Sequence, residues 1–242
     1  MSGANLDMQT LQDAGVHMGY ARSRRHPSAT PFIYGTKDRA DVFDLEETAR
    51  RLERAREFLA ECARSGGAVL FVGGKSEVAA HLKATAEAIG APYVAGRWIG
   101  GTLTNFKNIR KRVERLEKLL GERERGELGK YTKRERLLID REIDELERRF
   151  GGIVSLTDLP RALFVIDTRH ESTAVREANQ LGIPVIALAS TDCDFSQVQY
   201  PIPGNDTSVK SVKHVLERVA EAYQEGKRAA AQQPKTEADA AS

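Results

Sequence analysis

The chain has 242 residues, of which 40% are apolar and 30% charged, and its formal net charge is only +2. No apolar run approaches the roughly 20 residues that a membrane-spanning helix needs, and the apolar content excludes a chain too polar to form a core. The charge is unevenly distributed, because residues 105–150 hold 15 Lys and Arg against 11 Asp and Glu while the remainder is slightly acidic. That segment therefore says more about binding partners than the total charge does.

The first 40 residues are predicted to be mostly loop. Residues 1–19 contain no basic segment followed by an apolar run, so we expect no signal peptide and a cytoplasmic protein. Cys62 and Cys193 lie far apart and in no motif, which favours free thiols in a reducing compartment. The N-terminal segment also carries a basic cluster, formed by Arg22, Arg24 and Arg25.

Two similar units follow, each with the order strand, turn, helix, Gly-x-Pro, strand. A helix over 44–64 precedes the first unit, which comprises a buried strand at 68–72, a helix over 76–89 and a strand at 93–95. The second unit comprises a strand at 162–166, a helix over 173–181 and a strand at 185–188. This alternation predicts right-handed βαβ units, and hence a three-layer α/β domain whose mostly parallel sheet has helices on both faces.

The C-terminal part is predicted to contain one more helix and a tail. Residues 201–204 form a turn, and Asn205 or Asp206 can cap a helix that runs to about Tyr223. Residues 227–242 contain no bulky apolar side chain, so they cannot bury enough surface to offset the entropy of ordering. We expect this segment to be a disordered tail.

Residues 105–150 are predicted to form a helical hairpin inserted into the α/β domain, which then comprises 1–104 and 151–226. A glycine-bearing connector over 121–129 separates two helical runs, and Thr132 with Glu135 makes a capping box for the second. Spacings of 3 and 4 residues indicate an antiparallel coiled coil roughly 27 Å long. The apolar residues with these spacings are Phe106, Ile109, Val113, Leu116 and Leu120 in the first run and Ile139, Ile143, Leu146 and Phe150 in the second.

The first helical run is rich in cations. One interpretation is a solvated helix with ion pairs between successive turns, such as Glu114 with Lys118. The stretch from Lys107 to Arg112 contains no acid, however, and for it we favour contact with phosphates. The preceding corner, residues 97–105, combines Arg97 and the only tryptophan with glycines, threonines and an asparagine. It is either a packed structural corner, a phosphate contact, or both.

Other motifs suggest chemistry only weakly. Residues 73–76 (Gly-Gly-Lys-Ser) lack the first glycine of a phosphate loop, although the amides of 74–77 could hold a single anion. Asp167, His170 and Glu171 follow a strand at the end where α/β enzymes place ligands, but Ala174 replaces the second histidine of a zinc-protease helix. Turn and helix-cap roles are favoured for both. A small-molecule enzyme that uses these residues remains the rival hypothesis, and a protein-only adaptor with a coiled coil is a third.

Six motifs in a fixed order resemble the S-two family of bacterial small-subunit ribosomal proteins, over about residues 6–225. They lie at 11–19, 31–35, 97–105, 159–167, 177–184 and 200–206. The resemblance implies a flavodoxin-like (Rossmann-like) three-layer domain with a coiled-coil hairpin. It also implies a place on the small subunit where head meets body, binding to 16S rRNA, contact with neighbouring ribosomal proteins and a role in seating the mRNA-binding protein S-one.

The resemblance has local departures. Tyr20 stands where the family usually has histidine, and Arg25 and His26 stand where it often has Trp-Asn. Residues 190–195 also differ from the usual Asp-Thr-Asn-x-Asp-Pro. We expect a non-enzymatic protein with no cofactor, no metal site, no membrane and no small-molecule substrate. The candidate RNA-binding residues are Arg22, Arg24, Arg25, Arg97, Thr104, Asn105, Lys107, Asn108, Arg110 and Lys111.

Overall fold

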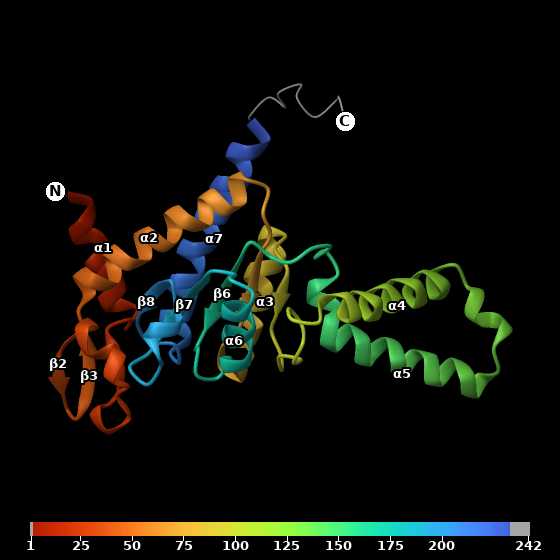
Figure 1. Cartoon of the computed structure of the whole chain (residues 1–242), viewed down its shortest axis with the longest axis horizontal. Helices are drawn as coiled ribbons and strands as arrows, with labels where there is room; N and C mark the ends of the chain where they lie inside the picture. The colour runs from red at the N-terminus through yellow and green to blue at the C-terminus, as the bar shows by residue number, and fades with distance from the viewer. Residues whose placement is uncertain (1, 233–242) are drawn as a thin grey trace.

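The computed structural model describes residues 2–232 and contains two sheets and a projecting helical arm (Figure 1). The main sheet is five-stranded, parallel throughout and ordered β5-β4-β6-β7-β8. Its strands are β4 (Val69–Val72), β5 (Tyr93–Val94), β6 (Ala162–Ile166), β7 (Val185–Ala189) and β8 (Tyr200–Pro203). The predicted α/β class and mostly parallel sheet are confirmed.

Helices cover both faces of this sheet because its central strands are apolar on both sides. Phe71 and Phe164 belong to the core under α2 (Leu45–Arg64), α3 (Ser76–Ile89) and α7 (Val209–Gln232). The alternate side chains, such as Leu70 and Leu163, face α6 (Ser172–Gln180) and the base of the arm. The hydrophobic core therefore has two layers, one on each face of the sheet.

Two C-terminal predictions are corrected. The turn expected at 201–204 is largely strand β8. This strand lies at the edge of the sheet, where a proline removes no hydrogen bond from the sheet's interior. Helix α7 runs to Gln232, so residues 227–232 are helical although they were assigned to the tail. Lys227 Nζ reaches the carbonyl oxygens of Ile89 and Gly90 at the end of α3, at 3.1 and 3.3 Å. The rest of the predicted tail, 233–242, lies outside the described residues.

The N-terminal segment is more ordered than predicted. It contains α1 (Ser2–Asp13) and a three-stranded antiparallel sheet of order β1-β3-β2. The strands are β1 (Met18–Ala21), β2 (Ile33–Lys37) and β3 (Ala40–Phe43), and the short 3-10 helices η1 (Arg22–Arg24) and η2 (Pro27–Phe32) lie between β1 and β2. A small apolar cluster that includes Phe32, Phe43 and Phe195 joins this sheet to the main one.

The arm (residues 105–150) consists of α4 (Phe106–Glu124), η3 (Glu127–Lys130) and α5 (Lys133–Phe150). The two long helices lie side by side and extend away from the body on the side opposite the small sheet (Figure 1). The predicted capping box between Thr132 and Glu135 is present. Leu119 is buried where Leu120 was expected, and Leu120 is half-buried. None of the described helices is long and apolar enough to span a membrane.

Candidate nucleic-acid interface

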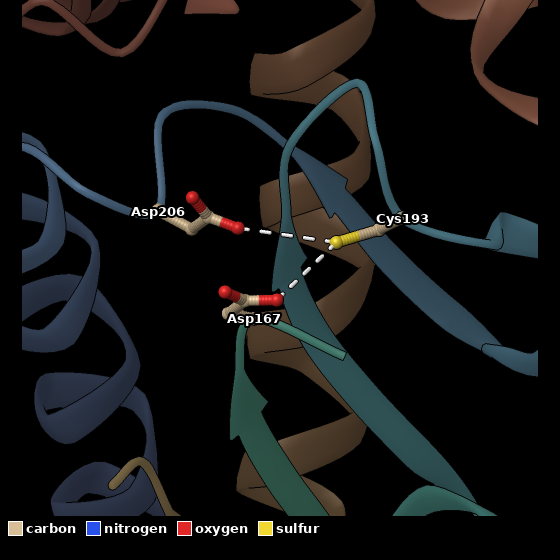
Figure 2. A group of neighbouring side chains, drawn as sticks. All are labelled: Asp167, Cys193 and Asp206. Carbon is tan, nitrogen blue, oxygen red and sulfur yellow. Dashed lines mark hydrogen bonds between the residues drawn. The ribbon is translucent and has the colours of Figure 1, made fainter. Parts of the chain in front are cut away.

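The carboxyl edge of the main sheet holds a cluster of buried charged groups. Lys75 follows β4, and its Nζ lies 2.5 Å from Asp167 Oδ2 and 3.4 Å from Asp206 Oδ1. Figure 2 shows Asp167, Cys193 and Asp206 pointing toward one another, with Cys193 Sγ 3.6 and 3.9 Å from the two carboxylates. These groups come from separate loops that the parallel strands bring to one edge.

Burial and neighbouring charges shift the pKa values of these groups in different directions. Burial and the nearby charge of Asp167 raise the pKa of Asp206 to about 6. Burial also acts on Asp167, but hydrogen bonds from Lys75 and from two backbone amides hold its pKa below the usual range. Burial raises the pKa of the Cys193 thiol to about 12, so this group is protonated at neutral pH.

The same three side chains place ligand atoms within 4.8 Å of one another, which is close enough to suggest a metal site. The Lys75 ammonium, however, already contacts both carboxylates. The charge of this cluster is therefore balanced by the protein itself.

The turn at 73–76 is not an open anion site. The amide of Gly74 donates a hydrogen bond of 2.8 Å to Glu171 Oε1, and the same carboxylate oxygen lies 2.8 Å from His170 Nδ1. The strand order places the topological switch point between β4 and β6, the usual ligand position in such sheets. Here the side chains of Lys75 and Glu171 lie at that position, which speaks against the small-molecule enzyme.

The corner at 97–105 is organised by Glu177 of α6, which is the first residue of the motif at 177–184 but is not among the candidate site residues. Its carboxylate accepts hydrogen bonds of 2.8–3.2 Å from Trp98 Nε1, the amides of Gly101, Leu103 and Thr104, and the Thr104 hydroxyl. Burial acts to raise the pKa of Glu177, but these donors outweigh it and keep the pKa below its usual range. Besides that motif, the sequence signal for a buried role is an acid on an apolar helix face, next to Ala174, Val175 and Ala178.

The structure thus favours the packed-corner interpretation for most of 97–105. Trp98 is buried, and the amides that could have met a phosphate already bind Glu177. Arg97 is different, because it is exposed and lines a hollow of about 580 Å³ between β5 and the base of α5. Arg148 and Arg149 of the arm line the same hollow.

The arginines of the N-terminal basic cluster also have internal partners. Arg25 binds Asp41 through Nε and Nη2, at 2.7 and 2.5 Å, and this contact is the main reason that the pKa of Asp41 is lowered. Arg24 stacks over the ring of Tyr20 at 4.0 Å and shares the Asp192 carboxylate with Arg169. The departures from the family pattern at Tyr20 and Arg25 therefore have structural roles in this chain.

The arm base divides into residues with and without partners. Arg110 donates hydrogen bonds to the Val154 carbonyl at 2.9 Å and to Glu117 at 3.2 Å, and Asn108 donates to Asn105 at 2.9 Å. Lys107 and Lys111 are exposed and have no hydrogen bond or ion pair from their side chains within residues 2–232.

Four of the ten candidate residues have an exposed, positively charged side chain that forms no hydrogen bond or ion pair in the described part of the chain. These are Arg22, Arg97, Lys107 and Lys111. Arg24, Arg25, Thr104 and Arg110 are held by other protein groups, and Asn105 and Asn108 bond each other. Two separate basic regions result, one at the base of the arm and one at η1.

Comparison with known proteins gives a consistent result. Residues 11–226 match the family model described as Ribosomal protein S2. Three proteins named small ribosomal subunit protein uS2 are similar over most of their length. They come from Coprothermobacter proteolyticus (39% identity, 93% of this chain, 84% of the relative), Corynebacterium urealyticum (41%, 95%, 86%) and Syntrophobacter fumaroxidans (40%, 93%, 82%). The chain therefore belongs to the ribosomal protein S2 family, whose members are non-enzymatic structural constituents of the small ribosomal subunit.

Proposed function

We propose that this chain, as a constituent of the cytoplasmic small ribosomal subunit, binds 16S rRNA through the base of its arm. The proposal rests on Lys107 and Lys111, which lie one helical turn apart on α4. Both side chains are exposed and have no partner in the described chain. Arg97 adds a further free cation where the corner leads into the same helix. Free cations release counterions when they meet phosphates, which is the main source of affinity for nucleic acid.

Two of the cations farther along α4 are less available to RNA. Arg115 binds Glu142 of α5 at 3.0 and 3.1 Å, and Lys118 lies 4.0 Å from Glu122. A paired cation must leave its carboxylate before it can meet a phosphate, and the freed carboxylate would then repel the RNA. The interface is therefore proposed at the arm base and not along the whole of α4.

The double variant Lys107→Glu with Lys111→Glu tests this proposal. We expect its affinity for 16S rRNA to fall at least tenfold, and the slope of log affinity against log salt to become shallower by roughly two, because about two phosphate contacts are lost. The matched control is the double variant Lys133→Glu with Arg134→Glu, which reverses two exposed cations at the start of α5. An equal loss in the control would contradict a localised interface.

We also propose that the arm is an antiparallel coiled coil inserted between residues 104 and 151 of the body. Ile109, Val113 and Leu116 form a buried stripe on α4, and Ile143 and Leu146 are buried on α5. Such a two-helix unit has little core of its own, so its orientation depends on contacts with the body. The Arg110 bond to the Val154 carbonyl is one such contact.

A protein neighbour is proposed for the second helix of the arm, and S-one is the partner that the family resemblance implies. Leu137 and Leu138 of α5 are 51% and 55% exposed, an apolar pair suited to the core of a protein contact. Replacing both with serine should lower the amount of S-one that copurifies with small subunits and leave 16S rRNA affinity unchanged. The control is Leu181→Ser on the body, and unchanged S-one content in the α5 variant would refute the contact.

A further inference from the structure

The outer face of the small antiparallel sheet has features that the proposed arm interface does not use. Tyr34 of β2 is 82% exposed, the highest value among the exposed large hydrophobic residues of the described chain. Met18 of β1 is also exposed, and both β1 and β2 pair with β3 at Val42. A solvent-facing aromatic ring next to aliphatic side chains is costly to leave in water and is typical of a binding surface.

A hollow of about 380 Å³ lies beside Tyr34. Gln12, His17 and Val42 line it together with the tyrosine. A volume of this size falls within the range of small-ligand pockets. The lining combines the π surface of Tyr34 with the exposed amide of Gln12, which can hydrogen-bond the edge of a planar base.

Cations gather at the other end of the same sheet. Lys37 and Arg39 flank the tight turn between β2 and β3, in which Asp38 and Arg39 adopt positive φ values of 50° and 68°. The amide of Arg22 donates a hydrogen bond of 3.0 Å to the Arg39 carbonyl, which holds η1 against this turn. Arg22, Lys37 and Arg39 are exposed, and none forms an ion pair within residues 2–232.

The two ends of this surface carry opposite charge. Asp38 is the one acid within the turn, so the basic end keeps an excess of positive charge. At the opposite end, the exposed Glu46 of α2 lines the hollow beside Tyr34. Phosphates are therefore attracted to the turn and repelled from the hollow, whereas an uncharged base is accepted there.

We propose that this face binds a single-stranded segment of RNA, with one unstacked base on Tyr34 in the hollow and the adjoining phosphates on Lys37, Arg39 and Arg22. Single-stranded RNA is bound in this way elsewhere, by bases stacked on aromatic side chains beside a cationic track. A protein partner would bury Tyr34 but would leave three unpaired cations to be matched by acids of its own. The site deepens the proposed RNA-binding function and is spatially separate from the arm, on the opposite side of the body (Figure 1).

The full-length protein with Tyr34→Ala tests the site, with a 12-nucleotide oligouridylate as the probe and a 12-base-pair RNA duplex as its comparison. Loss of one stacking contact should weaken oligouridylate binding about 5- to 100-fold in fluorescence anisotropy and leave duplex binding unchanged. Tyr34→Phe keeps the ring and should bind like the original protein. Lys37→Ala with Arg39→Ala should weaken binding and reduce its salt dependence.

The controls separate this site from the arm. Leu181→Ala, at an exposed apolar position elsewhere on the body, should not change oligouridylate binding. Full affinity in the Tyr34→Ala variant overturns the inference, and so does an equal loss in Tyr34→Phe. If Tyr34→Ala impairs subunit assembly without changing oligouridylate affinity, the occupant is a protein and the inference is wrong. The Lys107→Glu and Lys111→Glu variant reports on the arm independently, so either site can fail while the other stands.

Discussion

The carboxyl edge of the main sheet and the base of the arm are both rich in charged residues, but they use charge in opposite ways. At the sheet edge, Lys75 contacts both Asp167 and Asp206, and all three side chains lie largely out of solvent. At the arm base, Lys107 and Lys111 are exposed and have no ion pair within the described residues. A charged motif therefore indicates a binding site only where the fold leaves the charge without a partner.

The difference follows from the cost of removing a charge from water. A buried charge that loses its partner destabilises the fold by several kcal/mol, so the sheet edge must remain paired. An exposed cation contributes at most about 1 kcal/mol to stability through an ion pair, so the arm base can keep its cations for another molecule. Substitutions of paired charges at the sheet edge should therefore change stability, and substitutions of free cations at the arm base should change binding.

The largest expected effect is at Glu177, the buried carboxylate that joins α6 to the corner below the arm. Glu177→Ala leaves the indole N–H of Trp98 and several backbone amides without an acceptor, so we expect the free energy of unfolding to fall by about 3–5 kcal/mol. Urea unfolding followed by circular dichroism measures this. The exposed Glu114 of α4 is the matched control, because Glu114→Ala should change stability by less than about 0.5 kcal/mol. Similar losses of stability in the two variants would contradict the proposed difference between buried and exposed charges.

A smaller, pH-dependent effect is expected at Asp206. Its pKa is about 6 in the folded protein against an ordinary 3.8, so the folded state holds the proton more tightly than the unfolded state does. The resulting stabilisation is fully present below about pH 4 and is lost as the pH rises through about 6. Asp206→Asn cannot ionise, so it should gain about 1–3 kcal/mol relative to the original protein between pH 4.5 and 7.

The measurement is the difference in free energy of unfolding between Asp206→Asn and the original protein at each pH. The pH series should begin at about 4.5, because Asp167 has a lowered pKa and its stabilising contribution is lost as the pH falls through the acid range. A difference that does not depend on pH would show that the Asp206 carboxylate is ionised throughout. In that case the Lys75 contact would compensate its burial fully.

Local sequence patterns predicted much of the fold. The apolar runs of β4, β6 and β7 are fully buried as expected, and the capping box at Thr132 begins α5. The sequence does not predict the small N-terminal sheet, because none of its short strands contains a continuous apolar run like those of β4, β6 and β7. The sequence predicts a turn at β8 because two of its four residues are proline, and prolines at a sheet edge resemble turn residues in a sequence.

The candidate site was predicted less well, and Arg25 and Glu177 show why. Arg25 looked like a phosphate ligand, but its partner Asp41 comes from a neighbouring strand that the sequence did not predict. Glu177 begins the motif at 177–184 but is not among the candidate site residues, because the donors that it binds are more than 70 residues away in the chain. Lys107 and Lys111 remain candidates because residues 107–112 contain no acid and no carboxylate of the described residues forms an ion pair with either lysine.

The βαβ units and the two helices of the arm can be predicted from the sequence, because each depends on periodicities and caps within a few turns or strands. Which charges are free depends on the tertiary structure. Lys75 and Asp206 are 131 positions apart, and Trp98 and Glu177 are 79 apart, yet both pairs are in contact. Whether a charge is neutralised depends on such distant neighbours, and a residue's local sequence does not contain that information.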